Sequence, residues 1–147
     1  MGTRYLGTQE QVLALDTFIK LVRATDSVSN RIHRHLAETD LTVSQFGVLE
    51  ALFHLGPLNQ RDLAEKLLKS GGNMTLVIDN LEKRELVKRE REVDDRRCIK
   101  VCLTQKGHQL ISRIFPSHVA AVVNEIGILT PDEQEELGRL CRKLGKK

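Results

Sequence analysis

The sequence predicts a mostly α-helical protein of the α+β type. Residues 9–37 and 104–147 place apolar side chains three or four positions apart, or at multiples of these spacings, as amphipathic helices do. Between them, residues 86–103 contain two short runs that are typical of β-strands. No run approaches the roughly 20 apolar residues that a membrane-spanning helix needs, so we expect a soluble, cytoplasmic protein with no membrane partner.

Composition limits the class of protein further. The 147 residues fit one compact protomer, and with 40% hydrophobic but only 3% aromatic residues its core must consist of Leu, Val and Ile. The net charge is only +3, yet residues 83–106 carry nine basic against five acidic side chains. Such a patch suits a polyanionic partner, although a solvated surface can have the same composition. The three cysteines have no metal-binding spacing, so we expect no metal and no cofactor.

The first helix of the central region begins at Thr42. Thr42 and Gln45 have the spacing of a capping box, in which each side chain bonds the backbone N–H of the other residue. Residues 56–57, Gly-Pro, predict the end of this helix.

Two shorter helices follow in the predicted order. Asn59 is the expected N-cap of a helix that ends near Leu68, and Ser70 is the expected N-cap of one that runs to about Arg84. The second of these has an apolar stripe and, opposite it, a mixed face. That mixed face carries Gly72, Thr75, Leu76, Asp79, Asn80 and Lys83.

A β-hairpin and two further helices complete the chain. Residues 86–91 and 98–103 predict the two strands, joined by a charged tip. Thr104 is the expected cap of a fifth helix, which Pro116 should kink or interrupt. Thr130, followed by proline at the first helical position, predicts the start of the last helix.

This order of elements indicates a winged helix-turn-helix. Two short helices joined by a tight turn and followed by a hairpin are the arrangement in which the second helix enters the major groove of DNA. The hairpin, or wing, then lies where it can reach phosphate or the minor groove.

Three segments carry a resemblance to a known family. Residues 95–107 read DRRCIKVCLTQKG and match a wing signature of the form D-x-R-x-x-x-V-x-L-T followed by x-x-G; residues 63–67 and 79–84 match the helix-turn-helix core. On these motifs the chain resembles the MarR family of transcriptional regulators over nearly its whole length. Residues 70–87 and 110–122 most resemble the corresponding segments of a branch of the family that responds to catechols and quinones.

The resemblance implies a single protomer over 1–147 that forms a homodimer. Residues 9–37 and 104–147 would form the dimerisation region, and residues 41–103 the lobe that binds double-stranded DNA at a pseudo-palindromic operator. The apolar stripes at both ends agree, since a lone protomer would expose them. The family-level expectation is a repressor released by a small phenolic or other aromatic effector, or by oxidation.

The resemblance also assigns DNA contacts. It implies that Arg97 enters the minor groove and that Asp95 steadies the wing tip by ion pairing; the alternative is a solvated surface pair worth under about 1 kcal/mol. Backbone N–H groups of Ser70, Gly71 and Gly72 could bind a phosphate, or these residues could form only a loose turn. We expect base contacts from Asn73, Thr75, Leu76 and Asn80, and phosphate contacts from Arg89, Arg91, Arg96 and Lys100.

Two positions depart from the family pattern. Leu76 stands where many relatives carry arginine or another polar residue. Glu85 replaces the usual glycine after the recognition helix, and if that position still needs a left-handed backbone, the substitution costs about 1–2 kcal/mol.

The family binds its effectors in a crevice between the dimer helices and the DNA-binding lobe. The side chains expected to line that crevice here, although each taken singly fits an ordinary core residue better, are His33, Leu36, Phe46, Phe53 and Phe115.

Other chemistries have weaker signals. Cys98 beside Arg97 is either an oxidation site or an incidental residue, and we predict that Cys98→Ser leaves DNA affinity intact. A zinc role for His108 or His118 is a remote alternative. The sequence contains no nucleophile elbow, phosphate-binding loop or dinucleotide fingerprint, so we do not expect an enzyme. An interaction module that has lost DNA binding is the other alternative.

Overall fold

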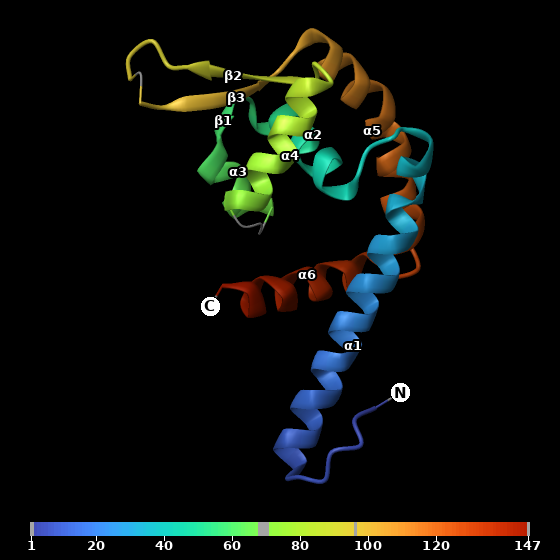
Figure 1. Ribbon diagram of the computed structural model, residues 1–147. Coiled ribbons are helices and arrows are strands. Elements are labelled where there is room, and N and C mark those ends of the chain that lie inside the picture. Colours follow the sequence, from blue (N-terminus) through green and yellow to red (C-terminus); the bar gives the residue numbers. More distant parts are fainter. Residues whose placement is uncertain (1, 68–70, 96, 147) are drawn as a thin grey trace. The chain divides into compact units, whose positions relative to one another are not determined.

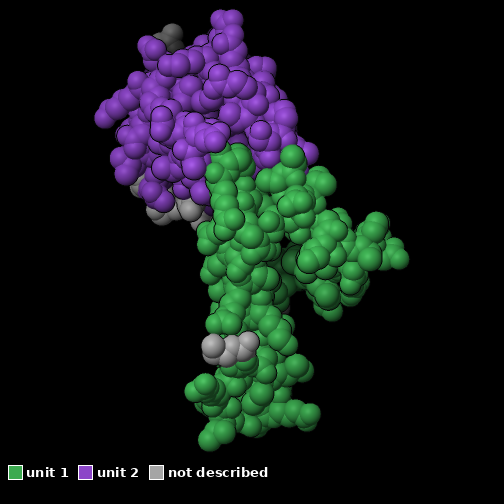
Figure 2. Space-filling view, turned by 90° about the vertical axis from the view of Figure 1, so that its right-hand side faces the viewer, with its two compact units in different colours: residues 1–35, 120–147 green, residues 36–119 purple. Residues whose placement is uncertain are grey.

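The computed structural model describes residues 2–67, 71–95 and 97–146 (Figure 1). The chain divides into two compact units, coloured separately in Figure 2. One consists of residues 1–35 and 120–147, the other of residues 36–119. Helices dominate, with one small antiparallel sheet, so the predicted fold class is confirmed. No helix in the described part of the chain combines the length and apolar content needed to cross a bilayer.

The first unit is built on α1 (Gln9–Ile32) and α6 (Pro131–Gly145). Both helices begin with capping boxes, and the box between Thr130 and Glu133 lies at the predicted start of α6. Arg31 of α1 binds Glu125 with an Nε–Oε2 distance of 2.7 Å. Most large apolar side chains of the unit remain exposed, including Leu13, Phe18, Leu21, Val123, Leu137, Leu140 and Leu144.

The predicted first helix is wrong at its end. α1 stops at Ile32, and the chain continues as a 3₁₀ helix, η1, over His33–Glu38. At the cap, the backbone N–H of His33 points to the carbonyls of both Ser29 and Arg31. A change from α-helical to 3₁₀ hydrogen bonding is common at the end of a helix, because the last carbonyl groups lack α-helical N–H partners.

The second unit contains α2 (Val43–Leu55), α3 (Gln60–Leu67) and α4 (Gly71–Lys83). The capping box of Thr42 and Gln45 is present, and Gly56, with φ +77°, ends α2 as predicted. The Oδ1 atom of Asn59 accepts a hydrogen bond of 2.8 Å from the backbone N–H of Asp62, which confirms the cap of α3. The predicted cap of α4, Ser70, lies outside the described residues.

A three-stranded antiparallel sheet has the order β1-β3-β2. β2 (Val87–Arg91) and β3 (Ile99–Leu103) form the predicted hairpin, with Val87 opposite Leu103 and Arg91 opposite Ile99. β1 (Leu58–Asn59), a strand not predicted from the sequence, pairs with the other edge of β3. This strand joins the middle of β3 to the start of α3.

The core of the second unit lies between α2, α3, α4, the sheet and the first turns of α5. Its fully buried side chains come from every one of these elements: Phe46, Val48, Leu49, Leu63, Met74, Ile78, Leu81, Leu86, Val87, Val101 and Ile111. Aliphatic residues supply nearly all of it, as the composition predicted. Their burial fixes both α4 and the hairpin on one framework.

The turn from α4 into β2 has a left-handed backbone at Glu85, with φ +61°. This is the position where Glu85 replaces glycine, so the condition for local strain is met. The Oγ1 atom of Thr104 donates a hydrogen bond of 2.6 Å to the Glu85 carbonyl, which ties the turn to the start of α5.

α5 extends over Gln105–Ile126. Its predicted cap is confirmed, because Thr104 Oγ1 accepts a hydrogen bond from the backbone N–H of Gly107 at 3.0 Å. The helix continues through Pro116, so an interruption there is wrong. A Cβ atom on Gly107 would overlap the carbonyl oxygen of Leu86, so glycine permits the close approach of α5 to the turn before β2.

Candidate nucleic-acid interface

Helix α4 has one buried and one exposed face. Met74, Ile78 and Leu81 have no exposed surface and pack into the core of the second unit. On the opposite face Asn73, Thr75 and Leu76 are exposed, and Leu76 retains 59% of its surface. Asn80, the fourth expected base contact, is half-buried. Packing of the apolar face therefore presents three of the four predicted base-contact residues to solvent.

Helix α3 supports this exposed face. The Nε2 atom of Gln60 donates a hydrogen bond to Thr75 Oγ1. Gln60 was not among the predicted site residues, and it lies directly after the cap of α3. The contact orients the Thr75 side chain on the surface of α4.

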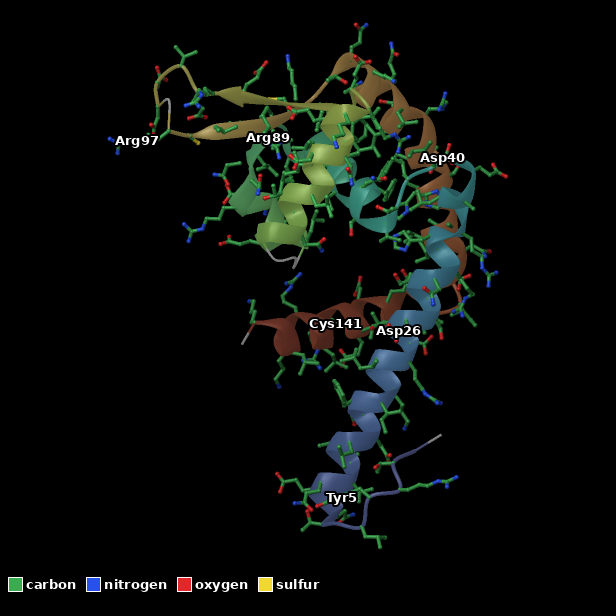
Figure 3. All side chains as sticks on the ribbon, viewed as in Figure 1. Tyr5, Asp26, Asp40, Arg89, Arg97 and Cys141 are labelled. Carbon is green, nitrogen blue, oxygen red and sulfur yellow. The ribbon has the colours of Figure 1, made fainter. Side chains whose placement is uncertain are left out.

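The tip of the hairpin presents Arg97 to solvent, pointing away from the sheet (Figure 3). The Oδ1 atom of Asp95 accepts a hydrogen bond of 3.0 Å from the backbone N–H of Arg97, and the Asp95 carbonyl accepts one of 3.0 Å from Cys98. Among the described residues Asp95 forms no ion pair, so its contacts with the tip are to the backbone. Arg96, another predicted contact, lies outside the described residues.

Arg89 joins the wing to α4. From β2 its guanidinium binds Asp79 at 2.7 Å and Glu82 at 2.9 Å, both on α4. The backbone N–H of Arg89 also donates to Glu82 at 3.2 Å. The side chain is only 24% exposed. Two carboxylates therefore already engage a side chain that was expected to contact phosphate.

The other predicted phosphate contacts differ in their surroundings. Arg91 is exposed on β2. Lys100 binds Glu92 with an Nζ–Oε1 distance of 2.5 Å, and hydrogen bonding and charge attraction from Glu92 raise the pKa of Lys100. Gly71 and Gly72 form the first residues of α4, where backbone N–H groups lack helical acceptors.

The partners of Arg89 were not predicted from the sequence. Asp79 and Glu82 lie three residues apart, a spacing that places two side chains on the same helix face. That spacing was the available signal, but the position of β2 over this face follows only from the fold.

Part of the predicted effector lining gathers within the second unit. The rings of Phe53 and Phe115 have centroids 6.0 Å apart, and His54 lies 5.1 Å from Phe53 and 4.7 Å from Phe115. His108 approaches Phe53 at 5.4 Å. We call the rings of His54, His108, Phe53 and Phe115 the aromatic cluster.

The remaining predicted lining residues are placed less uniformly. Phe46 and Leu36 are buried in the core, and His118 connects Phe46 to Phe115 with centroid distances of 4.8 and 5.7 Å. His33 belongs to the other unit. His54, His108 and His118 therefore act as aromatic neighbours of the phenylalanines, a role not predicted from the sequence. The described residues contain no group of three side chains that could hold a metal ion.

The wing cysteines are half-buried thiols. Burial, followed by the neighbouring carboxylate of Glu90, raises the pKa of Cys102; its Sγ lies 3.8 Å from Glu90 Oε2. A raised pKa reduces the thiolate fraction and with it the reactivity. Cys98, also half-buried, follows the tip in sequence.

Comparisons with known proteins agree with this geometry. The model of the MarR family matches residues 41–99, which include α2, α3, α4, β2 and the tip of the hairpin. The HTH-type transcriptional regulator MhqR of Bacillus subtilis is 33% identical over 132 residues, which cover 90% of this chain and 91% of that protein.

Solved structures show the same fold. A MarR family regulator from Streptomyces coelicolor in complex with DNA has a TM-score of 0.82 and 25% identity, covering 98% of this chain and 91% of that one. The Bordetella bronchiseptica protein BpsR has a TM-score of 0.79 and 26% identity, covering 97% of this chain and 99% of that one. The DNA binding of BpsR is regulated by 6-hydroxynicotinic acid. These relatives are transcriptional regulators and not enzymes. The chain belongs to the MarR family of transcriptional regulators.

Proposed function

We propose that this regulator binds double-stranded DNA sequence-specifically, with α4 in the major groove and the wing at the minor groove. The observation that carries the proposal is Arg97, exposed at the tip of a hairpin that Arg89 ties to α4. A guanidinium in that position suits a narrow minor groove, where the negative potential is strongest. The relative solved in complex with DNA supports this use of the fold.

The side chains on α4 suit the reading of bases. Asn73 and Asn80 carry amides that can bind adenine through two hydrogen bonds. The exposed Leu76 and the methyl group of Thr75 suit contact with the methyl group of thymine. We assign phosphate contacts to Arg91, Arg96, Lys100 and the backbone N–H groups of Ser70, Gly71 and Gly72, and a positioning role to Arg89.

We propose further that the working form is a homodimer. Leu13, Phe18 and Leu144 are among the apolar side chains that the first unit leaves more than half exposed. Monomeric proteins seldom expose so many on one pair of elements. A two-fold dimer would read a pseudo-palindromic operator with half-sites about one helical turn apart.

The regulatory signal that we propose is a small phenolic or other aromatic molecule, whose binding releases a repressor from DNA. The aromatic cluster supports this proposal, since aromatic rings prefer offset or edge-to-face neighbours of the kind that Phe53 and Phe115 offer. The relative BpsR, regulated by an aromatic acid, is a precedent within the fold.

Fluorescence anisotropy with the purified protein tests the proposal. The labelled duplex is taken from upstream of the protein's own gene, a scrambled duplex of equal composition is the control, and both are titrated at several salt concentrations. We expect tight binding to the first duplex, at least about 1,000-fold weaker binding to the second, and a steep loss of affinity with salt. Fragments selected from genomic DNA extend the test to operators elsewhere. Failure to bind any selected duplex, even at low salt, would contradict the proposal and favour an interaction module.

A further inference from the structure

A cavity of about 330 Å³ lies in the second unit, at the junction of α4, β2 and α5. The first turns of α5 contribute Lys106, Gln109, Leu110 and Arg113 to its lining, and the other lining residues are Thr39, which follows η1, and Arg84 and Leu86 in the turn between α4 and β2. The four α5 residues have spacings of three and four, so they share one face of that helix. The volume is at the lower end of the range for sites that bind small molecules.

Three cationic side chains converge on this cavity. Arg84, Lys106 and Arg113 form no ion pair with any carboxylate in the described part of the chain. Neutral backbone oxygens position two of them: Arg84 Nη1 donates to the Asp40 carbonyl at 2.8 Å, and Lys106 Nζ donates to the Arg84 carbonyl at 3.2 Å. These contacts orient the cations but leave their charge uncompensated.

The wing of the same unit shows a different pattern. There Lys88, Arg89 and Lys100 each bind a carboxylate at 2.5–2.9 Å. Three like charges around one concavity repel one another, and a bound anion would relieve that repulsion. The contrast between the two regions points to a ligand that supplies the missing negative charge.

We propose that this cavity binds a small organic anion carrying carboxylate or phosphate groups. The guanidinium groups of Arg84 and Arg113 suit two-point binding of such groups, and Lys106 adds a point charge. Leu86, which is 2% exposed, and the half-buried Leu110 supply an apolar surface for a compact carbon skeleton. The site shares no residue with the aromatic cluster or the proposed DNA contacts, and the proposal does not depend on them.

Isothermal titration calorimetry at constant ionic strength tests the site with two probes: isophthalate, a rigid dicarboxylate, and inorganic phosphate. Neutral isophthalamide is the control ligand. We expect saturable binding of at least one anion and none of the amide. The double variant Lys106→Gln/Arg113→Gln should weaken binding by at least about tenfold, because it removes two of the three charges. Both side chains are exposed, so thermal unfolding should confirm that the variant folds.

Lys66→Gln, a change of another exposed cation in the same unit, is the matched control and should leave anion binding unchanged. Binding that is absent, or that all variants lose equally, would overturn the proposal. A different result would also overturn it: no anion binding, together with a loss of duplex affinity in the double variant, would assign these cations to the DNA backbone.

Discussion

Arg89 on β2, labelled in Figure 3, and Asp79 on α4 form an ion pair with an Nη2–Oδ1 distance of 2.7 Å, and Glu82 binds the same guanidinium one helical turn further along. The two residues lie ten positions apart in sequence, and the turn between α4 and β2 brings them together. The contact couples the two elements that we expect to engage DNA, so the groove-reading helix and the wing keep a fixed relation.

Asp79→Asn distinguishes a positioning role of Arg89 from a phosphate contact. If Arg89 positions the wing, this variant should bind the operator duplex more weakly, by about threefold to tenfold, because the wing loses its anchor. If Arg89 instead binds phosphate, removal of a competing carboxylate should strengthen binding. Anisotropy titrations of Asp79→Asn and the wild type show whether the affinity for the operator duplex falls or rises.

The matched control is Glu65→Gln, which removes an exposed acidic charge from α3. Its binding should be unchanged or slightly stronger. Arg89→Gln adds a second readout, since a lost phosphate contact lowers the slope of log K against log salt by about one, whereas a lost anchor leaves the slope unchanged.

Glu85→Gly should stabilise the protein by about 1 kcal/mol. The φ of +61° at Glu85 is strained for a residue with a Cβ atom and easy for glycine. Urea unfolding at a fixed protein concentration measures the change. Glu85→Ala serves as the control, because it removes the carboxylate and keeps the strain. Equal stabilisation by both variants would show that charge and not backbone conformation is responsible.

Gly107→Ala should destabilise the protein by about 1–3 kcal/mol. The new Cβ would overlap the Leu86 carbonyl oxygen, so α5 and the turn before β2 would have to separate. Gly138→Ala is the contrasting change, since a Cβ there meets nothing within 4 Å, and helix propensity alone favours alanine by about 1 kcal/mol. Thermal or urea unfolding of the two variants should give shifts of opposite sign; shifts of the same sign would contradict the packing argument.

Cys102 should react with iodoacetamide at pH 7.5 more slowly than the thiol of a short unstructured cysteine peptide. Burial and Glu90 raise the pKa of Cys102, so less of it is thiolate at that pH. Glu90→Gln removes a carboxylate that raises this pKa, which lowers the pKa and should accelerate alkylation of Cys102. Mass spectrometry of the labelled peptides measures both rates, with Glu135→Gln as the control. No acceleration in Glu90→Gln would contradict the assigned cause.

Local signals predicted much of this fold. The capping boxes at Thr42 and Thr130 and the alternation of Ile99, Val101 and Leu103 depend on near neighbours, so the helices and the hairpin follow from the sequence. Leu58–Asn59 is different, because two residues show no periodicity and this strand exists only where β3 offers an edge.

The candidate site was predictable to the same degree. Arg97 at the wing tip and the exposed residues Asn73, Thr75 and Leu76 follow from the motif and from the apolar stripe of α4. The engagement of Arg89 by α4, and the gathering of Phe53 and Phe115 with histidines, arise from contacts between distant segments. Such contacts depend on how the elements pack, which residue spacing along the chain does not encode.

The most direct test of the central claim is duplex binding by Arg97→Ala across a series of salt concentrations, beside the wild type and Arg142→Ala, an exposed arginine of α6. We predict that Arg97→Ala weakens operator binding by about tenfold or more and lowers the salt slope by about one, because a minor-groove cation is lost. Arg142→Ala should match the wild type. Operator binding that Arg97→Ala leaves unchanged in affinity and in salt slope would contradict the account of the wing as a DNA-binding element.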